Sequence, residues 1–119
     1  SIDKLGSKII TIDNNTSIND AIDIMLKNNI RRLFIKDNIP YLVTDRVILN
    51  FIIENSISAI DVSNASIDRL KMKGVVMNKD TDIKSIILAL LSQTPPSSAV
   101  INDHVITPMD IIKNMIRYK

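Results

Sequence analysis

In the first half of the chain, short runs of β-branched residues alternate with stretches in which apolar residues recur at a helical period. A β-branched run is typical of a strand, and apolar residues three and four positions apart predict a helix. The predicted elements begin with a strand over 9–12 and a helix that runs from a cap at Thr16 or Ser17 to 28–29. Strands over 33–35 and 41–43 follow, with a turn over 37–40 between them, and the last element of this half is a helix over 44–55.

The second half repeats this order. Its predicted elements are a strand over 74–77, a helix capped by Thr81 and ended by Pro95 and Pro96, a hairpin of strands over 98–101 and 105–106 with its turn at Asn102 and Asp103, and a helix over 108–118. Proline ends a helix because it lacks the amide hydrogen. Each half is therefore a β-α-β-β-α unit, and the expected fold class is α/β with mixed sheets.

An internal repeat supports this division. Residues 1–5 (SIDKL) return 65 positions later as residues 66–70 (SIDRL), and the offset falls to 63 in the final hairpin. A fixed offset indicates one structural unit built twice. Two units of about 60 residues are each marginal alone, so we expect them to share a core, with a ligand cleft between them. The expected repeats are 1–55 and 66–119, joined by a connection over 56–65, together one compact domain.

Two predicted helices are apolar nearly all round, over 47–53 and 86–91. Such a helix either lies in the centre of a core or covers a second surface. In so small a domain we expect a second surface, and hence a homodimer whose interface is made of helices. The alternative is that both helices are buried within one monomer.

Composition narrows the possible functions. Apolar residues make up 45% of the chain and aromatics only 3%, so the core is aliphatic and stacking platforms for single-stranded nucleic acid are scarce. The net charge of +2 gives little support to nucleic-acid binding despite a pI near 9.0. The absence of cysteine excludes disulfides and thiolate metal sites, and a single histidine, His104, excludes a His-pair metal site. No membrane span or signal peptide is recognisable, so we expect a cytoplasmic protein.

The chain resembles a tandem pair of cystathionine-β-synthase (CBS) domains. The matching stretches are residues 10–25, with Ala21 and Met25 at the family's helix positions, and residues 29–35, which look like its I-R-R-L-P-V strand. The resemblance covers essentially the whole chain and is closer in the first half. It implies two β-α-β-β-α repeats related by a pseudo-two-fold axis, dimers formed through helices, and a regulatory role in which adenine nucleotides or related adenosyl ligands bind in the clefts between the repeats.

Residues 107–110 (TPMD) match the family's T-x-x-D motif between the last strand and the last helix. In this reading the Asp110 carboxylate accepts hydrogen bonds from both ribose hydroxyls. Thr107 contacts the sugar or the phosphate, which the amides at a helix N-terminus also favour. The same residues fit a helix cap, with Thr107 at the cap, Pro108 at the first position and an acid at the third.

The first half lacks an equivalent acid. Thr44 is present, but Val47 stands where the resemblance implies a ribose-binding carboxylate, and Asp45 lies about 200° away around a helix. We therefore expect one competent cleft.

In that cleft the resemblance places the adenine against Ile10, Ile30 and Arg31. Ser98 stands where relatives often carry a basic phosphate ligand, which predicts weakened phosphate binding. Arg31 and Arg32 are strand neighbours that point to opposite faces, so at most one of them grips a phosphate. The alternative is that both arginines are solvated charges. His104, at a hairpin tip, is expected to be exposed and without function.

The favoured hypothesis is a non-enzymatic regulatory module that senses AMP, ADP or ATP, without a catalytic cofactor, and acts on an unidentified regulated protein. The alternative is a CBS pair that has lost its ligand and serves as a dimerisation or partner-docking module, which Val47 and Ser98 favour. Nucleic-acid binding is supported only by mild basicity. No acid and base surround a nucleophile, so the sequence does not indicate an enzyme.

Overall fold

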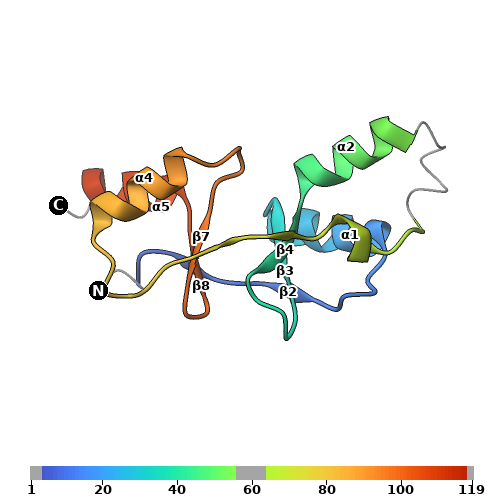
Figure 1. The fold of residues 1–119 in the computed structure, drawn as a ribbon, viewed down its shortest axis with the longest axis horizontal. Coiled ribbons are helices and arrows are strands. Elements are labelled where there is room, and N and C mark those ends of the chain that lie inside the picture. Colours follow the sequence, from blue (N-terminus) through green and yellow to red (C-terminus); the bar gives the residue numbers. More distant parts are fainter. Residues whose placement is uncertain (1–3, 56–63, 118–119) are drawn as a thin grey trace. The chain divides into compact units, whose positions relative to one another are not determined.

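The computed structural model describes residues 4–55 and 64–117, which divide into two compact units (Figure 1). The N-terminal unit comprises Ile10–Lys73, and the C-terminal unit comprises Ser1–Ile9 together with Gly74–Lys119. Among the described residues, each unit has a four-stranded mixed sheet and two α-helices, which confirms the α/β fold class. Within the described residues, no helix has the length and apolar content needed to cross a membrane.

The N-terminal unit has the sheet order β2-β3-β4-β5, in which β2 and β3 are parallel and the other pairs antiparallel. Its elements are β2 (Thr11–Ile12), α1 (Ile18–Asn28), β3 (Arg32–Ile35), β4 (Tyr41–Thr44), α2 (Asp45–Asn55), the 3-10 helix η2 (Ile67–Leu70) and β5 (Met72–Lys73). Helix α1 begins where the Ser17 hydroxyl accepts a hydrogen bond from the Asp20 amide at 3.1 Å. It ends at Asn29, whose φ of 53° is left-handed.

The core of this unit is aliphatic, as the composition predicted. Its buried residues are Ile12, Ile18, Ala21, Met25, Leu33, Ile35, Val43, Ile48, Ile67 and Leu70. Two of these residues, Ile67 and Leu70, come from η2, so the segment after residue 63 helps to close the core of this unit.

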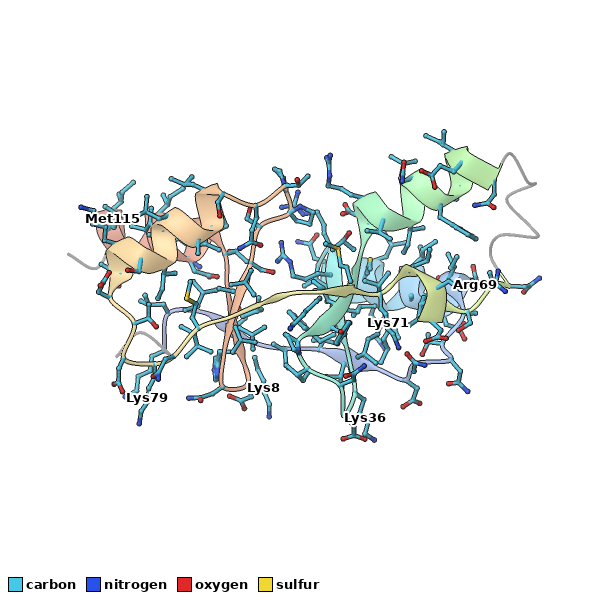
Figure 2. The ribbon with its side chains drawn as sticks, in the orientation of Figure 1. Lys8, Lys36, Arg69, Lys71, Lys79 and Met115 are labelled. Carbon is cyan, nitrogen blue, oxygen red and sulfur yellow. The ribbon has the colours of Figure 1, made fainter. Side chains whose placement is uncertain are left out.

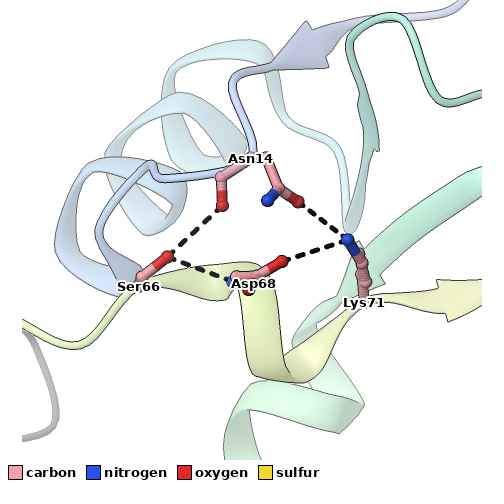
Figure 3. Close-up of polar contacts among 4 residues, drawn as sticks. All are labelled: Asn14, Ser66, Asp68 and Lys71. Carbon is pink, nitrogen blue, oxygen red and sulfur yellow. Dashed lines mark hydrogen bonds and ion pairs between the residues drawn. The ribbon is translucent and has the colours of Figure 1, made fainter.

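Polar contacts hold this segment in place (Figure 3). The Ser66 hydroxyl donates to the Asn14 carbonyl at 3.3 Å. Lys71 Nζ donates to Asn14 Oδ1 at 3.1 Å and to Asp68 Oδ1 at 3.0 Å. The segment after residue 63 is therefore held to the turn that precedes α1.

The C-terminal unit has the sheet order β1-β8-β7-β6, with β6 and β7 parallel and the other pairs antiparallel. Its elements are β1 (Ser7–Lys8), β6 (Val75–Val76), α4 (Ile83–Leu91), β7 (Ala99–Ile101), β8 (His104–Ile106) and α5 (Pro108–Arg117). Helices α4 and α5 lie side by side (Figure 1). The core residues are Ile86, Leu90, Ala99, Ile101, Ile106 and Ile111.

The two units share one topology, and the fourth strand of each comes from the other sequence repeat. β1 precedes the first repeat's β-α-β-β-α order but pairs with β8, whereas β5 precedes that of the second repeat but pairs with β4. The strands predicted over 9–12 and 74–77 are consequently shorter than expected. The chain passes from one sheet to the other at 9–10 and again at 73–74. At the first crossing the Ile9 amide still donates to the Asp103 carbonyl beside one sheet, and the Ile10 carbonyl accepts from the Phe34 amide of the other.

Because of these crossings, the boundaries of the compact units differ from the boundaries of the sequence repeats. The repeat boundaries 1–55 and 66–119 stay a prediction about the sequence. The connection over 56–65 lies mostly outside the described residues, as do the first three residues of the initial SIDKL segment.

The predicted cap and end of the helix α4 need correction. Asp82 rather than Thr81 caps α4, because the Asp82 carboxylate accepts a hydrogen bond from the Ser85 amide at 2.7 Å. The Thr81 hydroxyl instead accepts from the Asn78 amide in the preceding turn. Helix α4 ends at Leu91 with Ser92 as its C-cap, so the helix stops before it reaches Pro95 and Pro96, which were expected to end it.

Candidate functional site

The start of α5 carries the strongest candidate site. Asp110 Oδ2 accepts hydrogen bonds from the Thr107 amide at 2.8 Å and from the Thr107 hydroxyl at 2.9 Å. The Asp110 amide donates to the Thr107 carbonyl at 3.1 Å, and both residues are half-buried. One half of the predicted capping box is therefore present, in which the acid reaches back to the Thr107 amide, and the Thr107 hydroxyl donates to the same acid. Both Thr107 donors share Oδ2, so the cap does not use Oδ1.

The corresponding helix start in the N-terminal unit is built differently. The Thr44 hydroxyl accepts a hydrogen bond from the Val47 amide at 3.2 Å, and Val47 packs against the core. Asp45 is exposed, and its Oδ1 accepts from the neighbouring Arg46 amide at 2.8 Å. At the start of α2 the Asp45 carboxylate therefore bonds to the backbone amide of the next residue, and the Val47 side chain has no hydrogen-bond acceptor.

Ser98 and Thr107 lie just beyond the ends of two paired strands of the C-terminal sheet. Ala99 pairs with Ile106 across β7 and β8, so Ser98 and Thr107 adjoin the same end of this hairpin. Ser98 is buried, and its amide donates to Gln93 Oε1 at 3.2 Å. The structure therefore brings three of the predicted site residues, Ser98, Thr107 and Asp110, to one end of the C-terminal sheet.

The other predicted site residues belong to the N-terminal unit. Ile10 and Ile30 are half-buried and pack against the aliphatic core. Arg31 is exposed, whereas Arg32 is half-buried in β3, opposite Thr44. Arg31 lies in the bend before β3, so the two arginines are not neighbours on one strand as expected.

Ile30 and Arg31 also line a groove that the sequence did not reveal. The groove lies between α1 and α2 and has a volume of about 270 Å³. Its lining residues are Ile22, Met25, Leu26, Ile30, Arg31, Asp45, Ile48, Leu49 and Ile52. The apolar period of both helices was visible in the sequence, but periodicity does not distinguish a side chain in a core from one that lines an open groove.

Two further observations limit the chemistry. His104 is half-buried at the start of β8, and its Nδ1 lies 2.8 Å from Asp103 Oδ1. This hydrogen bond lowers the pKa of the Asp103 carboxyl below its ordinary value, and nothing else about the pair indicates a site. Among the described residues, no group of three or more histidine, cysteine or acidic side chains could hold a metal ion.

Comparison with known protein families finds a match in the first half of the chain. Residues 4–54 match the CBS domain model, which covers the first repeat. No curated protein matches the sequence.

Solved structures resemble the whole chain. A conserved CBS domain protein of unknown function from Thermoplasma acidophilum is 21% identical, with a TM-score of 0.77 over 98% of this chain and 70% of that one. A CBS-domain protein from Agrobacterium tumefaciens is 13% identical, with a TM-score of 0.81 over 97% of this chain and 98% of that one. CBSX2, solved in complex with AMP, is 14% identical, with a TM-score of 0.73 over 99% of this chain and 97% of that one.

Identities this low establish a shared fold and leave the ligand open. The family model covers the first repeat, and the structural likeness extends over both repeats. Residues 4–54 thus match the CBS domain family in sequence, and the whole chain has the fold of solved CBS-domain proteins.

Proposed function

We propose that this CBS domain pair is a regulatory module that binds an adenine nucleotide, with Asp110 and Thr107 holding the ribose. The observation that carries the proposal is the double hydrogen bond from Thr107 to Asp110 Oδ2. It fixes the carboxylate at the start of α5 and leaves the second oxygen, Oδ1, outside the cap. The AMP complex of the structurally similar CBSX2 supports a nucleotide as the ligand.

The chemistry of the pair favours a sugar over a phosphate at this position. The Thr107 hydroxyl donates its single hydrogen to Asp110, so its oxygen can only accept further hydrogen bonds. Asp110 Oδ1 is also an acceptor. Two adjacent acceptors suit the two hydroxyl donors of a ribose, and a carboxylate repels a phosphate oxygen. A 2′-deoxynucleotide would leave one acceptor unused and is expected to bind more weakly.

The remaining predicted contacts stay predictions. They assign the adenine to Ile10, Ile30 and Arg31, one phosphate to Arg31 or Arg32, and weakened phosphate binding to Ser98. Each assignment is tested by its own variant, because loss of an arginine should weaken ATP more than adenosine, whereas a change at Ile10 or Ile30 should weaken both.

A thermal-shift panel tests the nucleotide proposal. The ligands are AMP, ADP, ATP, GTP and S-adenosylmethionine, and the proteins are the wild type, Asp110→Asn and the matched control Asp45→Asn from the other repeat. A ligand at one hundred times its dissociation constant stabilises the folded state by about 2.7 kcal/mol, which raises the Tm by several degrees. We expect a shift with adenine nucleotides that Asp110→Asn abolishes and Asp45→Asn retains. If no nucleotide shifts the Tm, or if both variants respond like the wild type, the proposed site is wrong.

A second candidate function is a dimerisation or docking module without a nucleotide. The observation that favours it is the apolar surface that the helices leave exposed: Leu49 and Ile53 on α2, Leu91 on α4, and Ile116 on α5 are each more than half exposed. Large exposed aliphatic side chains gathered on helices mark an interaction surface. We propose that these helices join two copies of the chain, and that a nucleotide, where bound, is sensed by a regulated partner protein. Sedimentation equilibrium measures the self-association directly, and a monomer at all concentrations would contradict it.

A further inference from the structure

The groove between α1 and α2 combines an aliphatic wall with two opposite charges. All of its lining residues are aliphatic or methionine except Arg31 and Asp45. The groove lies entirely within the N-terminal unit, and neither Thr107 nor Asp110 lines it. Its volume of about 270 Å³ lies just below the range of about 300–1,000 Å³ that is typical of pockets for drug-sized ligands. The groove therefore suits a smaller molecule.

The two charged residues adjoin each other at one point of this lining. Arg31 lies in the bend before β3, and Asp45 is the first residue of α2. The Asp45 amide donates to the Arg31 carbonyl at 3.1 Å, so the two backbones are hydrogen-bonded neighbours. Both residues are exposed. A cationic and an anionic side chain thus leave the backbone at neighbouring positions beside the apolar wall.

These two charges do not neutralise each other. In the part of the chain that the structure describes, no ion pair joins Arg31 and Asp45. Asp45 Oδ1 accepts a hydrogen bond from the Arg46 amide, which leaves Oδ2 outside that contact. Lys36 and Lys71, two basic residues that Figure 2 labels in this unit, do not line the groove. A ligand in the groove would therefore meet one cation, Arg31, and one anion, Asp45.

This pattern of charge selects among small aliphatic ligands. An aliphatic acid would gain a contact with the guanidinium of Arg31 but would be repelled by the carboxylate of Asp45. An aliphatic amine would be attracted and repelled in the opposite way. An α-amino acid carries a carboxylate and an ammonium group on the same carbon, so it satisfies both neighbours at once. A guanidinium binds a carboxylate through two parallel hydrogen bonds, which fixes the orientation of the ligand.

We propose that the α1–α2 groove binds a small aliphatic α-amino acid of the leucine, isoleucine or valine type. The carboxylate binds Arg31, the ammonium group binds Asp45, and the side chain packs against the aliphatic wall. This inference goes beyond the nucleotide proposal, because it assigns a second kind of ligand to the other unit. Arg31 is also one of the residues predicted to contact the adenine, so the test relies on Asp45 and Leu49 instead.

Isothermal titration calorimetry of the wild type compares leucine with three smaller or incomplete analogues. Each buried methylene contributes about a fourfold gain in affinity, so alanine is expected to bind at least about tenfold more weakly than leucine. Isocaproate is leucine without its ammonium group, and isoamylamine is leucine without its carboxylate. Both are expected to bind several-fold more weakly, since an exposed ion pair contributes modestly. Isocaproate binding as tightly as leucine would overturn the role of Asp45.

The two enantiomers of leucine provide a control that changes neither charge nor hydrophobicity. Three fixed contacts, with the carboxylate, the ammonium group and the side chain, distinguish the two hands of a ligand. We therefore expect unequal affinities for the enantiomers. Equal affinities would show that leucine only adheres to an apolar surface, and they would overturn the proposed site.

Substitutions place the ligand in the groove. Leu49→Trp fills the groove with a larger side chain, and Leu88→Trp on α4 is its matched control, since Leu49 and Leu88 are 59% and 58% exposed. We expect Leu49→Trp and Asp45→Asn to weaken leucine binding several-fold or more, and Leu88→Trp to retain it. Retained binding in Leu49→Trp would overturn the site, as would a wild type that does not bind leucine because a second copy of the chain covers the groove.

The same variants separate this proposal from the nucleotide proposal. Asp45→Asn should lose the response to leucine and keep the response to adenine nucleotides, whereas Asp110→Asn should do the reverse. Leucine binding that survives Asp110→Asn supports the groove even if no nucleotide binds. Loss of leucine binding in Asp110→Asn would contradict a site confined to the N-terminal unit.

Discussion

Thr107 donates both its amide hydrogen and its hydroxyl hydrogen to a single oxygen of Asp110, Oδ2, at 2.8 and 2.9 Å. The sequence allowed two interpretations of this motif, a helix cap and a ribose contact. The geometry makes the two interpretations compatible, because the contacts with Thr107 use Asp110 Oδ2 and do not use Oδ1. Stability and ligand binding can therefore be separated by experiment at these two residues.

Thr107→Val removes the hydroxyl and keeps the amide, so one of the two hydrogen bonds to Asp110 is lost. We expect the free energy of unfolding to fall by about 1 kcal/mol, since a half-buried side-chain hydrogen bond contributes about that much. Urea denaturation measures the change. Thr94→Val, at an exposed position, is the control, and equal effects of the two substitutions would contradict a role for the Thr107 hydroxyl in the cap.

Gly6→Ala tests the importance of the strand that the C-terminal unit takes from the start of the chain. A Cβ added at Gly6 would collide with the backbone carbonyl of Val105, beside the pairing of Ser7 with Val105 in β1 and β8. Backbone cannot move aside as a flexible side chain can, so we expect a loss of about 1–3 kcal/mol. Hydrogen exchange should show reduced protection in β8 of the variant. Ser7→Ala, a neighbouring exposed position, should leave β8 protection near that of the wild type, and unchanged protection in Gly6→Ala would argue against the close approach of these strands.

Lys71→Met tests the contacts that hold η2 to the turn before α1 (Figure 3). Hydrogen bonds with Lys71, and then with Asn14, lower the pKa of Asp68 from its ordinary value of 3.8. A lowered carboxyl pKa contributes stability that is fully present above the unfolded pKa and is lost as the pH falls through the folded pKa. The variant should therefore raise the pKa of Asp68 toward 3.8 and reduce the acid sensitivity of the free energy of unfolding below about pH 4.

A carboxyl-carbon NMR titration reads the pKa of Asp68 directly. Lys36→Met, which removes an exposed lysine elsewhere in the N-terminal unit, is the matched control. If the pKa of Asp68 in both variants equals that in the wild type, the contact between Lys71 and Asp68 does not lower this pKa.

Ser17→Ala removes the cap of α1. The Ser17 hydroxyl accepts the Asp20 amide at 3.1 Å, and its loss is expected to reduce the free energy of unfolding by about 1 kcal/mol. Ser17→Asp keeps a capping acceptor and should restore most of this stability. Thermal unfolding followed by circular dichroism measures both variants, and a failure of the aspartate to improve on the alanine would show that the hydroxyl acts in some other way.

The elements that depend on local chemistry were predictable from the sequence. The period of Ile18, Ala21 and Met25 predicted α1, and Ser17 was one of the two caps expected for it. The turn at Asn102 and Asp103 is present, with Asn102 at a φ of 57°. Helix caps, turns and apolar periods are set by residues within a few positions of one another, so they are readable without knowledge of the fold.

The cap of α4 shows where local reasoning becomes ambiguous. Thr81 and Asp82 are adjacent and both are good capping residues, but the backbone of Asp82 takes the extended conformation, and its carboxylate reaches the Ser85 amide. The choice depends on the turn in which Thr81 accepts from Asn78, so the sequence alone did not decide between the two neighbours.

The sequence by itself determined the repeated β-α-β-β-α order, the aliphatic core and the candidate pair Thr107 and Asp110, because each follows from local spacing or from a resemblance in residue type. Only the tertiary structure decided that β1 and β5 pair with the sheet of the other repeat, that Thr107 bonds twice to Asp110 Oδ2, and that α1 and α2 enclose a groove while α5 leaves apolar side chains exposed. Strand partners and exposed surfaces depend on contacts between residues far apart in the chain. An apolar residue has the same local signature whether its neighbours cover it or leave it open.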